Sequence, residues 1–208
     1  MKLFLIRHGE TEWNALRRVQ GRTDIPLNKR GVLQAEAAAD YLRHEGISAV
    51  YSAPLSRARD TAGRIAGASG AGCVRVLEGL TEINFGGWEG KTDRELMEQF
   101  PEHWGDWNWV LDPQLCRGIG AESAEEILSR SLASLEVIRR ENPEGTSVAV
   151  VSHTMPIKLV AAHFIGMPVS RIRGMLLYNC AASALIFYRD GDVSLERWND
   201  ASYLRGLL

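Results

Sequence analysis

Residues 3–14 of the chain, LFLIRHGETEWN, join a short apolar run to a group of charged and polar residues. The run from Leu3 to Ile6 is continuous rather than alternating, which is typical of a strand buried on both faces. It ends at Arg7 and His8, and Gly9 then permits a sharp turn of the backbone. The stretch therefore predicts an inner strand that carries a guanidinium and an imidazole to its carboxyl end.

Two later segments repeat this arrangement. The run Ala49 to Tyr51 precedes a serine, and the run Val148 to Val151 precedes a serine and His153. Between them, two segments space their apolar residues for one helical face: Leu33, Ala37, Tyr41 and Leu42 in the first, and Ile127, Leu128, Leu132, Leu135 and Ile138 in the second. Strands alternating with helices predict a three-layer α/β/α sandwich around a mostly parallel central sheet. Ligands of such sheets bind beyond the carboxyl ends of the strands, where His8 and His153 are expected.

The composition is that of an ordinary globular protein, with 208 residues of which 45% are hydrophobic and 24% charged. This length predicts one domain over residues 1–208. The formal net charge of -2 disfavours nucleic acid and anionic membranes as partners, so a small molecule is expected instead. No apolar run reaches the ~18 residues that a membrane-spanning helix needs.

The cysteines and most histidines indicate neither a disulfide framework nor a metal site. The cysteines are odd in number and far apart, which favours a reducing cytoplasm: Cys73, Cys116 and Cys180. Three histidines lack the spacing of metal ligands and are expected in surface or packing roles: His44, His103 and His163. The stretch Gly67 to Gly72 predicts a flexible turn.

A tryptophan-rich segment at about residues 88–123 differs from the rest of the chain. It has weak periodicity, two prolines, and four of the six tryptophans: Trp88, Trp104, Trp107 and Trp109. Such a segment predicts an excursion over the sheet. It could act as a lid that walls a pocket, or as a small helical flap whose aromatic residues pack onto the core.

The stretch Arg7 to Asn14 resembles the RHGE(T)xxN signature of the histidine phosphatase and phosphoglycerate mutase superfamily. The resemblance implies that His8 is a nucleophile. A neutral imidazole nitrogen can attack phosphorus and leave a labile phosphohistidine. The alternative is a core histidine after a strand, which is disfavoured because the adjacent Arg7 would be costly to bury without an anion.

Residues 51–62, YSAPLSRARDTA, resemble the SSPLxRAxxTA element of the same family, at the start of a helix. The resemblance implies that Arg57 binds phosphate, since a guanidinium matches two phosphate oxygens at once. Arg7 and Arg57 together could replace a magnesium ion, so neither a metal nor another cofactor is expected. By the same resemblance four further residues line the phosphate pocket, with turn or capping roles as the alternative: Asn14, Gln20, Gly21 and Thr23.

Residues 80–90, LTEINFGGWEG, resemble the LxExxFGxWEG stretch of the phosphatase branch. The resemblance implies that Glu82 exchanges the proton. A carboxyl group held near an apolar wall and a bound dianion should have a raised pKa, so that it can donate to the leaving group at neutral pH. Glu89, in the same loop, is the alternative candidate for this proton donor.

Residues 148–153, VAVVSH, resemble the element that ends in a second histidine. The resemblance implies that His153 contacts the phosphoryl oxygens, and its protonated form would stabilise charge in the transition state. The family often continues with small residues, whereas this chain has Thr154 and Met155, which puts the usual backbone contact at the substrate-binding position Thr154 in question. Residues 120–123, GAES, resemble a GES element whose serine would cap a helix and whose glutamate could face the site.

The resemblance implies hydrolysis of a small-molecule phosphomonoester through a phosphohistidine, by a broad-specificity or α-ribazole phosphatase-like enzyme. One alternative is a phosphoglycerate mutase, which returns the phosphoryl group to a bound sugar acid. Another is a non-catalytic module that only binds phosphate-bearing ligands. A homo-oligomer is compatible with the sequence.

Overall fold

The computed structural model describes residues 1–104 and 108–208, without the side chains of residues 103 and 108. The expectations for the side chain of His103 and for Trp107 lie outside the described residues. The described strands form one sheet in the order β3-β2-β4-β1-β5-β6. Their bounds are β1 Lys2–Arg7, β2 Ile47–Ser52, β3 Val74–Val76, β4 Ser147–Ser152, β5 Ala182–Phe187 and β6 Val193–Asp200.

The sheet is mostly parallel, as the alternating pattern predicts. β1 pairs in parallel with β4, β4 with β2, and β2 with β3, whereas β5 and β6 join as antiparallel strands at one edge. The three expected strands are confirmed as β1, β2 and β4. Val148 to Val151 in β4 and Leu3 to Ile6 in β1 are buried almost completely, because helices cover both faces of the inner strands.

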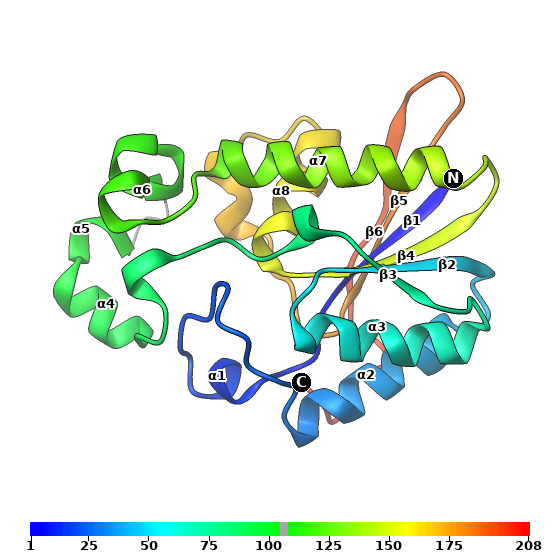
Figure 1. The fold of residues 1–208 in the computed structure, drawn as a ribbon, viewed down its shortest axis with the longest axis horizontal. Helices are drawn as coiled ribbons and strands as arrows, with labels where there is room; N and C mark the ends of the chain where they lie inside the picture. The colour runs from blue at the N-terminus through cyan, green and yellow to red at the C-terminus, as the bar shows by residue number, and fades with distance from the viewer. Residues whose placement is uncertain (105–107) are drawn as a thin grey trace.

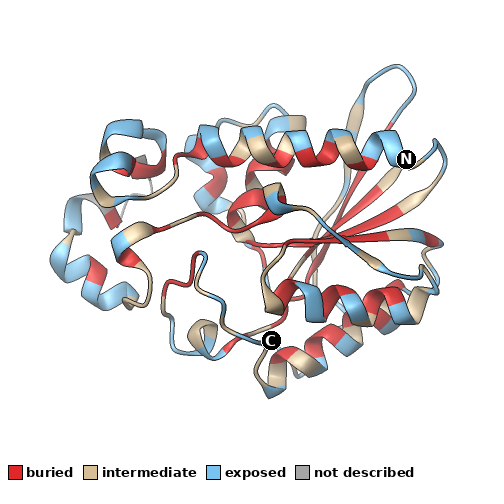
Figure 2. Cartoon of the chain, in the orientation of Figure 1, coloured by how far each residue is buried: buried red, intermediate tan, exposed pale blue. Residues whose placement is uncertain are grey.

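Helices form the outer layers, with α2 and α3 on one face of the sheet and α7 and α8 on the other (Figure 1). Their buried sides face inward and their exposed sides face outward (Figure 2). The α-helices are α1 Glu12–Ala15, α2 Lys29–Leu42, α3 Ser56–Ser69, α4 Asp93–Gln99, α5 Pro101–Trp104, α6 Pro113–Ile119, α7 Ala124–Glu141 and α8 Thr154–Phe164. The 3-10 helices are η1 Glu78–Leu80, η2 Gly86–Trp88, η3 Asn108–Leu111 and η4 Val169–Gly174.

Two details of the helices differ from the sequence pattern. Leu33 is 50% exposed, because α2 buries instead the small residues of a neighbouring face, among them Ala35 and Ala38, which pack with Cys180 and Leu204. The glycine-rich turn begins later than expected, since α3 includes Gly67 and ends at Ser69, followed by Gly70 with a φ of 72°. That left-handed conformation favours glycine, so the helix stops there.

The tryptophan-rich segment does not lie over the sheet, but extends past the carboxyl ends of its parallel strands (Figure 1). Trp88, Trp104 and Trp109 are buried in a second hydrophobic core, together with residues of α7 and α8. Trp88 makes edge contacts with the rings of both other tryptophans, at centroid distances of 5.5 and 4.9 Å. The aromatic packing expected for a flap is therefore present. Within the described ranges, no helix is long and apolar enough to cross a membrane.

Candidate active site

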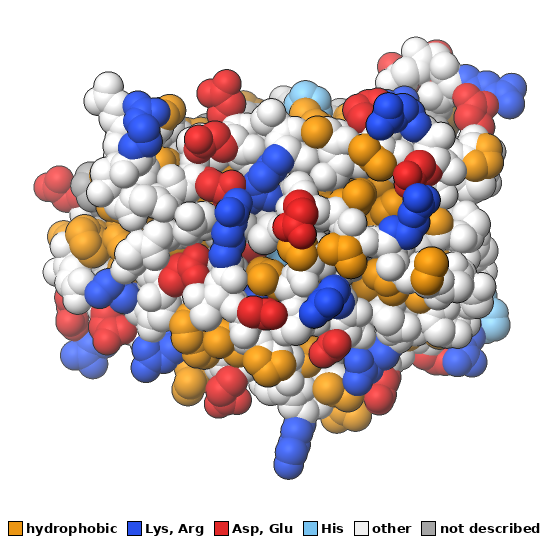
Figure 3. All heavy atoms as spheres, viewed as in Figure 1, with side chains coloured by type: hydrophobic (Ala, Val, Ile, Leu, Met, Phe, Trp, Pro, Cys, Tyr) orange, Lys and Arg blue, Asp and Glu red, His pale blue; other side chains and the backbone are white. Residues whose placement is uncertain are grey.

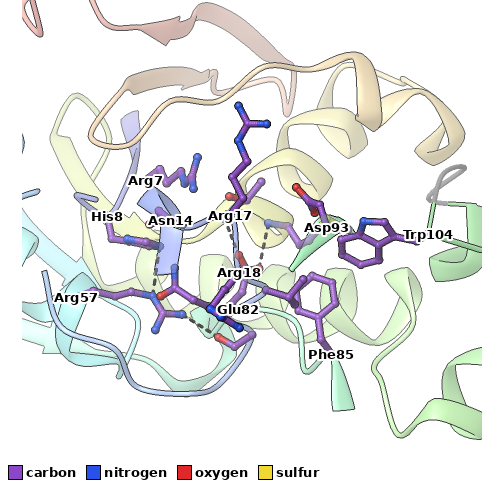
Figure 4. Close-up of a pocket in the computed structure, with 15 residues that line it drawn as sticks. Arg7, His8, Asn14, Arg17, Arg18, Arg57, Glu82, Phe85, Asp93 and Trp104 are labelled. Atoms are coloured by element: carbon purple, nitrogen blue, oxygen red, sulfur yellow. Dashed lines mark hydrogen bonds between the residues drawn. The ribbon is translucent and has the colours of Figure 1, made fainter. Parts of the chain in front are cut away.

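The carboxyl ends of β1 and β4 bring the predicted site residues together. Arg7 ends β1, His8 follows it, and His153 follows β4 directly. These ends open into a cavity of about 220 Å³ (Figure 4). Eight of the predicted residues line it: Arg7, His8, Asn14, Gln20, Gly21, Arg57, Glu82 and Thr154. His153 lies beside the cavity, with its ring centroid 5.0 Å from that of His8.

The hydrogen bonds of His8 fix which of its ring nitrogens carries the proton. Nδ1 lies 2.7 Å from the Gly9 carbonyl oxygen, which can only accept, so Nδ1 carries the hydrogen. Nε2 accepts from Nε of Arg57 at 3.3 Å. Burial, and then the charges of Arg57 and Arg7, hold the pKa of His8 well below its usual value. His8 is therefore a neutral imidazole with its lone pair on Nε2.

Two guanidinium groups, of the buried Arg57 and the half-buried Arg7, lie near this imidazole. Arg57 is fully buried at the start of α3 and donates to the carbonyl oxygens of Thr23 and Gly21 at 2.9 and 2.8 Å. Burial lowers its pKa to about 10, which leaves it charged at neutral pH. Arg7 donates to the Leu177 carbonyl at 2.7 Å, while its buried Nε has no partner among the described residues. The positive charge of these two groups is thus poorly balanced by the protein, which favours binding of an anionic ligand.

A lysine adds to this positive charge. Lys158 lies one helical turn after Thr154 in α8, and burial, together with the charge of Arg7, lowers its pKa to about 8. On the molecular face in Figure 3, by contrast, acidic and basic side chains are interspersed. The positive charge that the net charge of -2 does not supply is therefore concentrated in and around the cavity.

Glu82 is the carboxylate nearest to these cations in the cavity. It is buried and accepts backbone N–H groups at the start of α8, from Thr154 at 3.0 Å and Met155 at 3.1 Å. Burial raises its pKa, although the N–H donors and Arg57 oppose that rise. A carboxyl group with a raised pKa can both donate and accept a proton near neutral pH.

Glu89, the rival carboxylate, faces the loop before α2 instead of the cavity. It accepts from the backbone N–H groups of Arg22 and Thr23 at 2.8 and 2.9 Å, and from the Thr23 hydroxyl. The Thr23 hydroxyl is engaged with Glu89, and Thr23 is not among the residues that line the cavity, so its expected role in substrate binding stays a prediction. Thr23 contributes its carbonyl oxygen to Arg57 instead.

His153 is fully buried, and neither of its ring nitrogens has a partner among the described residues. Burial, and then the charge of Arg57, hold its pKa well below the usual value. Without a ligand, burial and the charge of Arg57 therefore disfavour the protonated form of His153, and its expected contact with the phosphoryl oxygens stays a prediction. A neutral imidazole can still donate one N–H to an anion.

Some of the remaining predicted residues line the cavity, and others stabilise the structure around it. Asn14 accepts at Oδ1 from the Thr11 N–H and from the Asn179 amide, and its Nδ2 has no acceptor among the described side chains and backbone. Oε1 of the buried Gln20 also lacks a partner in the described ranges. Ser123 caps α7 as expected, whereas Glu122 turns away to pair with Arg130 at 3.0 Å.

The sequence model of the histidine phosphatase superfamily, branch 1, matches residues 3–201. The chain belongs to this superfamily. This histidine phosphatase is 36% identical over 171 residues to phosphoserine phosphatase 1 of Hydrogenobacter thermophilus, across 82% of this chain and 79% of that one. It is 35% identical over 186 residues to the probable phosphoglycerate mutase GpmB of Escherichia coli O1:K1, across 88% and 83% of the two chains.

A solved structure of similar fold is a phosphoserine phosphatase mutant from Entamoeba histolytica in complex with phosphoserine. It matches this histidine phosphatase with a TM-score of 0.82 and 31% identity, covering 98% of each chain. These likenesses confirm the family expected from the sequence motifs, and they confirm the α/β fold. They compare whole chains, so the roles of individual side chains are argued from the distances and hydrogen bonds of the site.

Sequence reasoning missed six of the residues that line the cavity of this histidine phosphatase, and it named a seventh, Trp104, only in a segment that could wall a pocket. The six are Arg17, Arg18, Val19, Phe85, Asp93 and Met155. Sequence reasoning also missed Asn179, which donates to the His8 carbonyl at 2.9 Å. Several of these positions lie within or next to the matched motifs, which is the signal that could have found them. Asp93 and Asn179 have no such signal, because only the fold brings them to the site.

Glu89→Gln tests how far that carboxylate holds the loop of residues 20–23. The amide keeps one acceptor oxygen but loses the charge that strengthens four hydrogen bonds, including one from the Phe85 N–H. Hydrogen bonds to charged groups contribute ~1.5–3 kcal/mol, so Tm is expected to fall by roughly 5 °C in a chain of this size. Thermal unfolding followed by circular dichroism measures this. The control is Glu12→Gln at an exposed position, and equal Tm values for the two variants would contradict the anchoring role.

Proposed function

We propose that this histidine phosphatase hydrolyses a small phosphomonoester through a phosphohistidine formed on Nε2 of His8. The observation that carries the proposal is a neutral His8 with its lone pair on Nε2, near the guanidinium groups of Arg57 and Arg7. Partnerless donors on Arg7 and His153 support it, because buried polar groups normally have partners and a phosphoryl group would satisfy these. In this proposal residues 1–208 form one domain, which carries all of the residues that act on the ester.

In the first step, the Nε2 lone pair of His8 attacks phosphorus, and the bond from phosphorus to the ester oxygen breaks. Arg7, Arg57 and an N–H of His153 hold the phosphoryl oxygens, which spreads the developing charge. Arg57 must then exchange its contact with Nε2 for one with a phosphoryl oxygen. The departing alkoxide takes the proton of Glu82, whose raised pKa keeps that proton available.

In the second step, water takes the place of the alcohol. The carboxylate of Glu82 accepts a proton from water as the water oxygen attacks phosphorus, and the phosphorus–nitrogen bond breaks. The electron pair of that bond returns to Nε2, so His8 is again neutral and Glu82 is again protonated. Phosphate leaves, and one water has been consumed for each ester cleaved.

A mutase is the second candidate, and the similarity to a probable phosphoglycerate mutase favours it. In that reaction the phosphohistidine would transfer its phosphoryl group to a bound sugar acid instead of to water. One assay separates the two: release of inorganic phosphate is measured beside conversion of 3- to 2-phosphoglycerate. Conversion without phosphate release would favour the mutase, and the absence of both reactions with every phosphomonoester would favour a binding module.

The size of the cavity bears on which leaving groups the substrate can carry. A cavity of about 220 Å³ is below the roughly 300–1,000 Å³ of sites for drug-sized ligands, which favours a compact leaving group over a nucleotide-like one such as α-ribazole. Two of the similar proteins are named phosphoserine phosphatases. A phosphorylated amino acid is therefore one candidate beside phosphoglycerate.

Metal removal tests the proposed source of positive charge. We expect dialysis against EDTA to leave kcat with p-nitrophenyl phosphate within about twofold of the untreated value, because Arg7 and Arg57 would supply the charge that a metal ion supplies elsewhere. Initial rates before and after dialysis, with and without added Mg²⁺ or Zn²⁺, provide the measurement. A large loss that a metal ion restores would contradict metal-independent hydrolysis.

A further inference from the structure

The cavity has a second charged end that the proposed phosphoryl transfer does not use. Asp93 and Trp104 line it on the side away from His8 and Arg57, and Arg17 also reaches the cavity (Figure 4). Trp104 is buried in the second core, with its ring 6.3 Å from that of Phe85. This end therefore has a fixed aromatic wall and the carboxylate of Asp93, and Arg17, whose backbone adjoins that of Asp93, also lines the cavity.

The backbone holds the two charged residues on adjoining segments. The Asp93 N–H donates to the Arg17 carbonyl at 3.3 Å, and Arg18 and Thr92 form an antiparallel bridge beside them. Arg18 reinforces the contact by donating to the Gly90 carbonyl at 2.6 Å. The first turn of α4 and the loop after α1 are thereby tied together at the mouth of the cavity.

Arg17 and Asp93 do not satisfy each other's charge. No ion pair joins them, and neither side chain has a hydrogen-bond partner within residues 1–104 and 108–208. Arg17 also has a φ of 52°, a left-handed conformation that is unfavourable for a residue with a side chain. Such strain is found where the surrounding structure imposes it, often at ligand sites.

We propose that Arg17 and Asp93 select a leaving group that carries both a carboxylate and an ammonium group, so that the substrate is a compact phosphorylated α-amino acid. Arg17 would bind the carboxylate, and Asp93 would bind the ammonium group. The phosphoryl group would lie at His8, and the short carbon chain would pass along Trp104. This inference rests on the proposed phosphatase function and adds to it the chemical class of the leaving group.

The test compares four phosphomonoesters whose leaving groups differ in charge. O-phosphoserine carries both charges, O-phosphoethanolamine only the ammonium, 3-phosphoglycerate only the carboxylate, and p-nitrophenyl phosphate neither. The value of kcat/KM is measured for each with the wild type, Arg17→Gln and Asp93→Asn. Arg94→Gln is the matched control, because that side chain is 89% exposed in an ion pair with Glu98 on α4.

The wild type is expected to prefer O-phosphoserine over the other three esters. Arg17→Gln should lower kcat/KM for the two carboxylate-bearing esters about tenfold relative to O-phosphoethanolamine, as expected for one lost charge-assisted contact. Asp93→Asn should lower it by a similar factor for the two ammonium-bearing esters relative to 3-phosphoglycerate. The Arg94→Gln control should keep the wild-type order of substrates.

Three results would overturn the inference. If both variants lower kcat/KM for all four esters by the same factor, the two residues act on the structure and not on the leaving group. If neither variant changes the order of kcat/KM among the substrates, the second end of the cavity does not distinguish leaving groups by their charge. Absence of phosphate release from every ester would instead refute the phosphatase function, and the inference would fall with it.

Discussion

His8→Ala is expected to lower kcat for p-nitrophenyl phosphate by on the order of 10⁴- to 10⁶-fold while the protein stays folded, because the nucleophile is removed. The neutral imidazole of His8 is the only side chain that forms a bond to phosphorus in the proposed mechanism. What remains in the variant is binding and charge stabilisation by the guanidinium groups. Phosphate release is measured with both proteins, and circular dichroism checks folding.

His163→Ala is the matched control, because His163 is exposed near the end of α8 and takes no part in the cavity. A second measurement looks for the intermediate. Rapid quenching of the wild type with a ³²P-labelled ester should give an acid-labile, base-stable adduct that is absent from His8→Ala. Turnover by His8→Ala at the wild-type rate, or an adduct on another side chain, would refute the proposed nucleophile.

Glu82→Gln is expected to lower kcat/KM for an alkyl phosphate such as O-phosphoserine by ~10²- to 10⁴-fold, the usual worth of a general acid. The amide keeps an oxygen for the N–H donors of α8 but cannot donate a proton to the alkoxide. The loss should be smaller for p-nitrophenyl phosphate, since p-nitrophenolate leaves without a proton. Glu126→Gln, at the capping glutamate of α7, is the control.

The pH profile gives an independent test of Glu82. The protonated form donates in the first step, and burial raises the pKa of this group. Activity with an alkyl phosphate should therefore be present below that pKa and fall as the pH rises through it. At low pH the activity should fall only as His8 becomes protonated and loses its lone pair, and the pKa of His8 is lowered. If Glu82→Gln loses activity at high pH in the same way as the wild type, the titrating group is not Glu82.

Local patterns were sufficient for the inner strands and for the longest helices. The runs Leu3 to Ile6 and Val148 to Val151 are buried on both faces, and their continuous apolarity is visible without knowledge of the fold. The edge strands were harder to predict. β3 has three residues, and in β6 exposed residues alternate with half-buried ones, so neither has a distinctive apolar run.

The site shows the same division. Arg7, His8, Arg57 and His153 could be named because each lies in a contiguous motif at the end of a strand or the start of a helix. Arg17 and Asp93 could not be paired from the sequence. They lie 76 positions apart, and exposed charged residues at such positions are usually solvated surface residues.

The sequence by itself determined the order of strands and helices and the chemical groups available, because both depend on neighbouring residues. Only the tertiary structure decided the charge state of those groups. His8 and His153 have the same intrinsic pKa in any unfolded chain, and it is lowered here by burial beside Arg57 and Arg7, which come from different parts of the fold. The same folding turned Glu82 toward the cavity and Glu89 toward its supporting loop, a choice that two glutamates in one loop could not reveal.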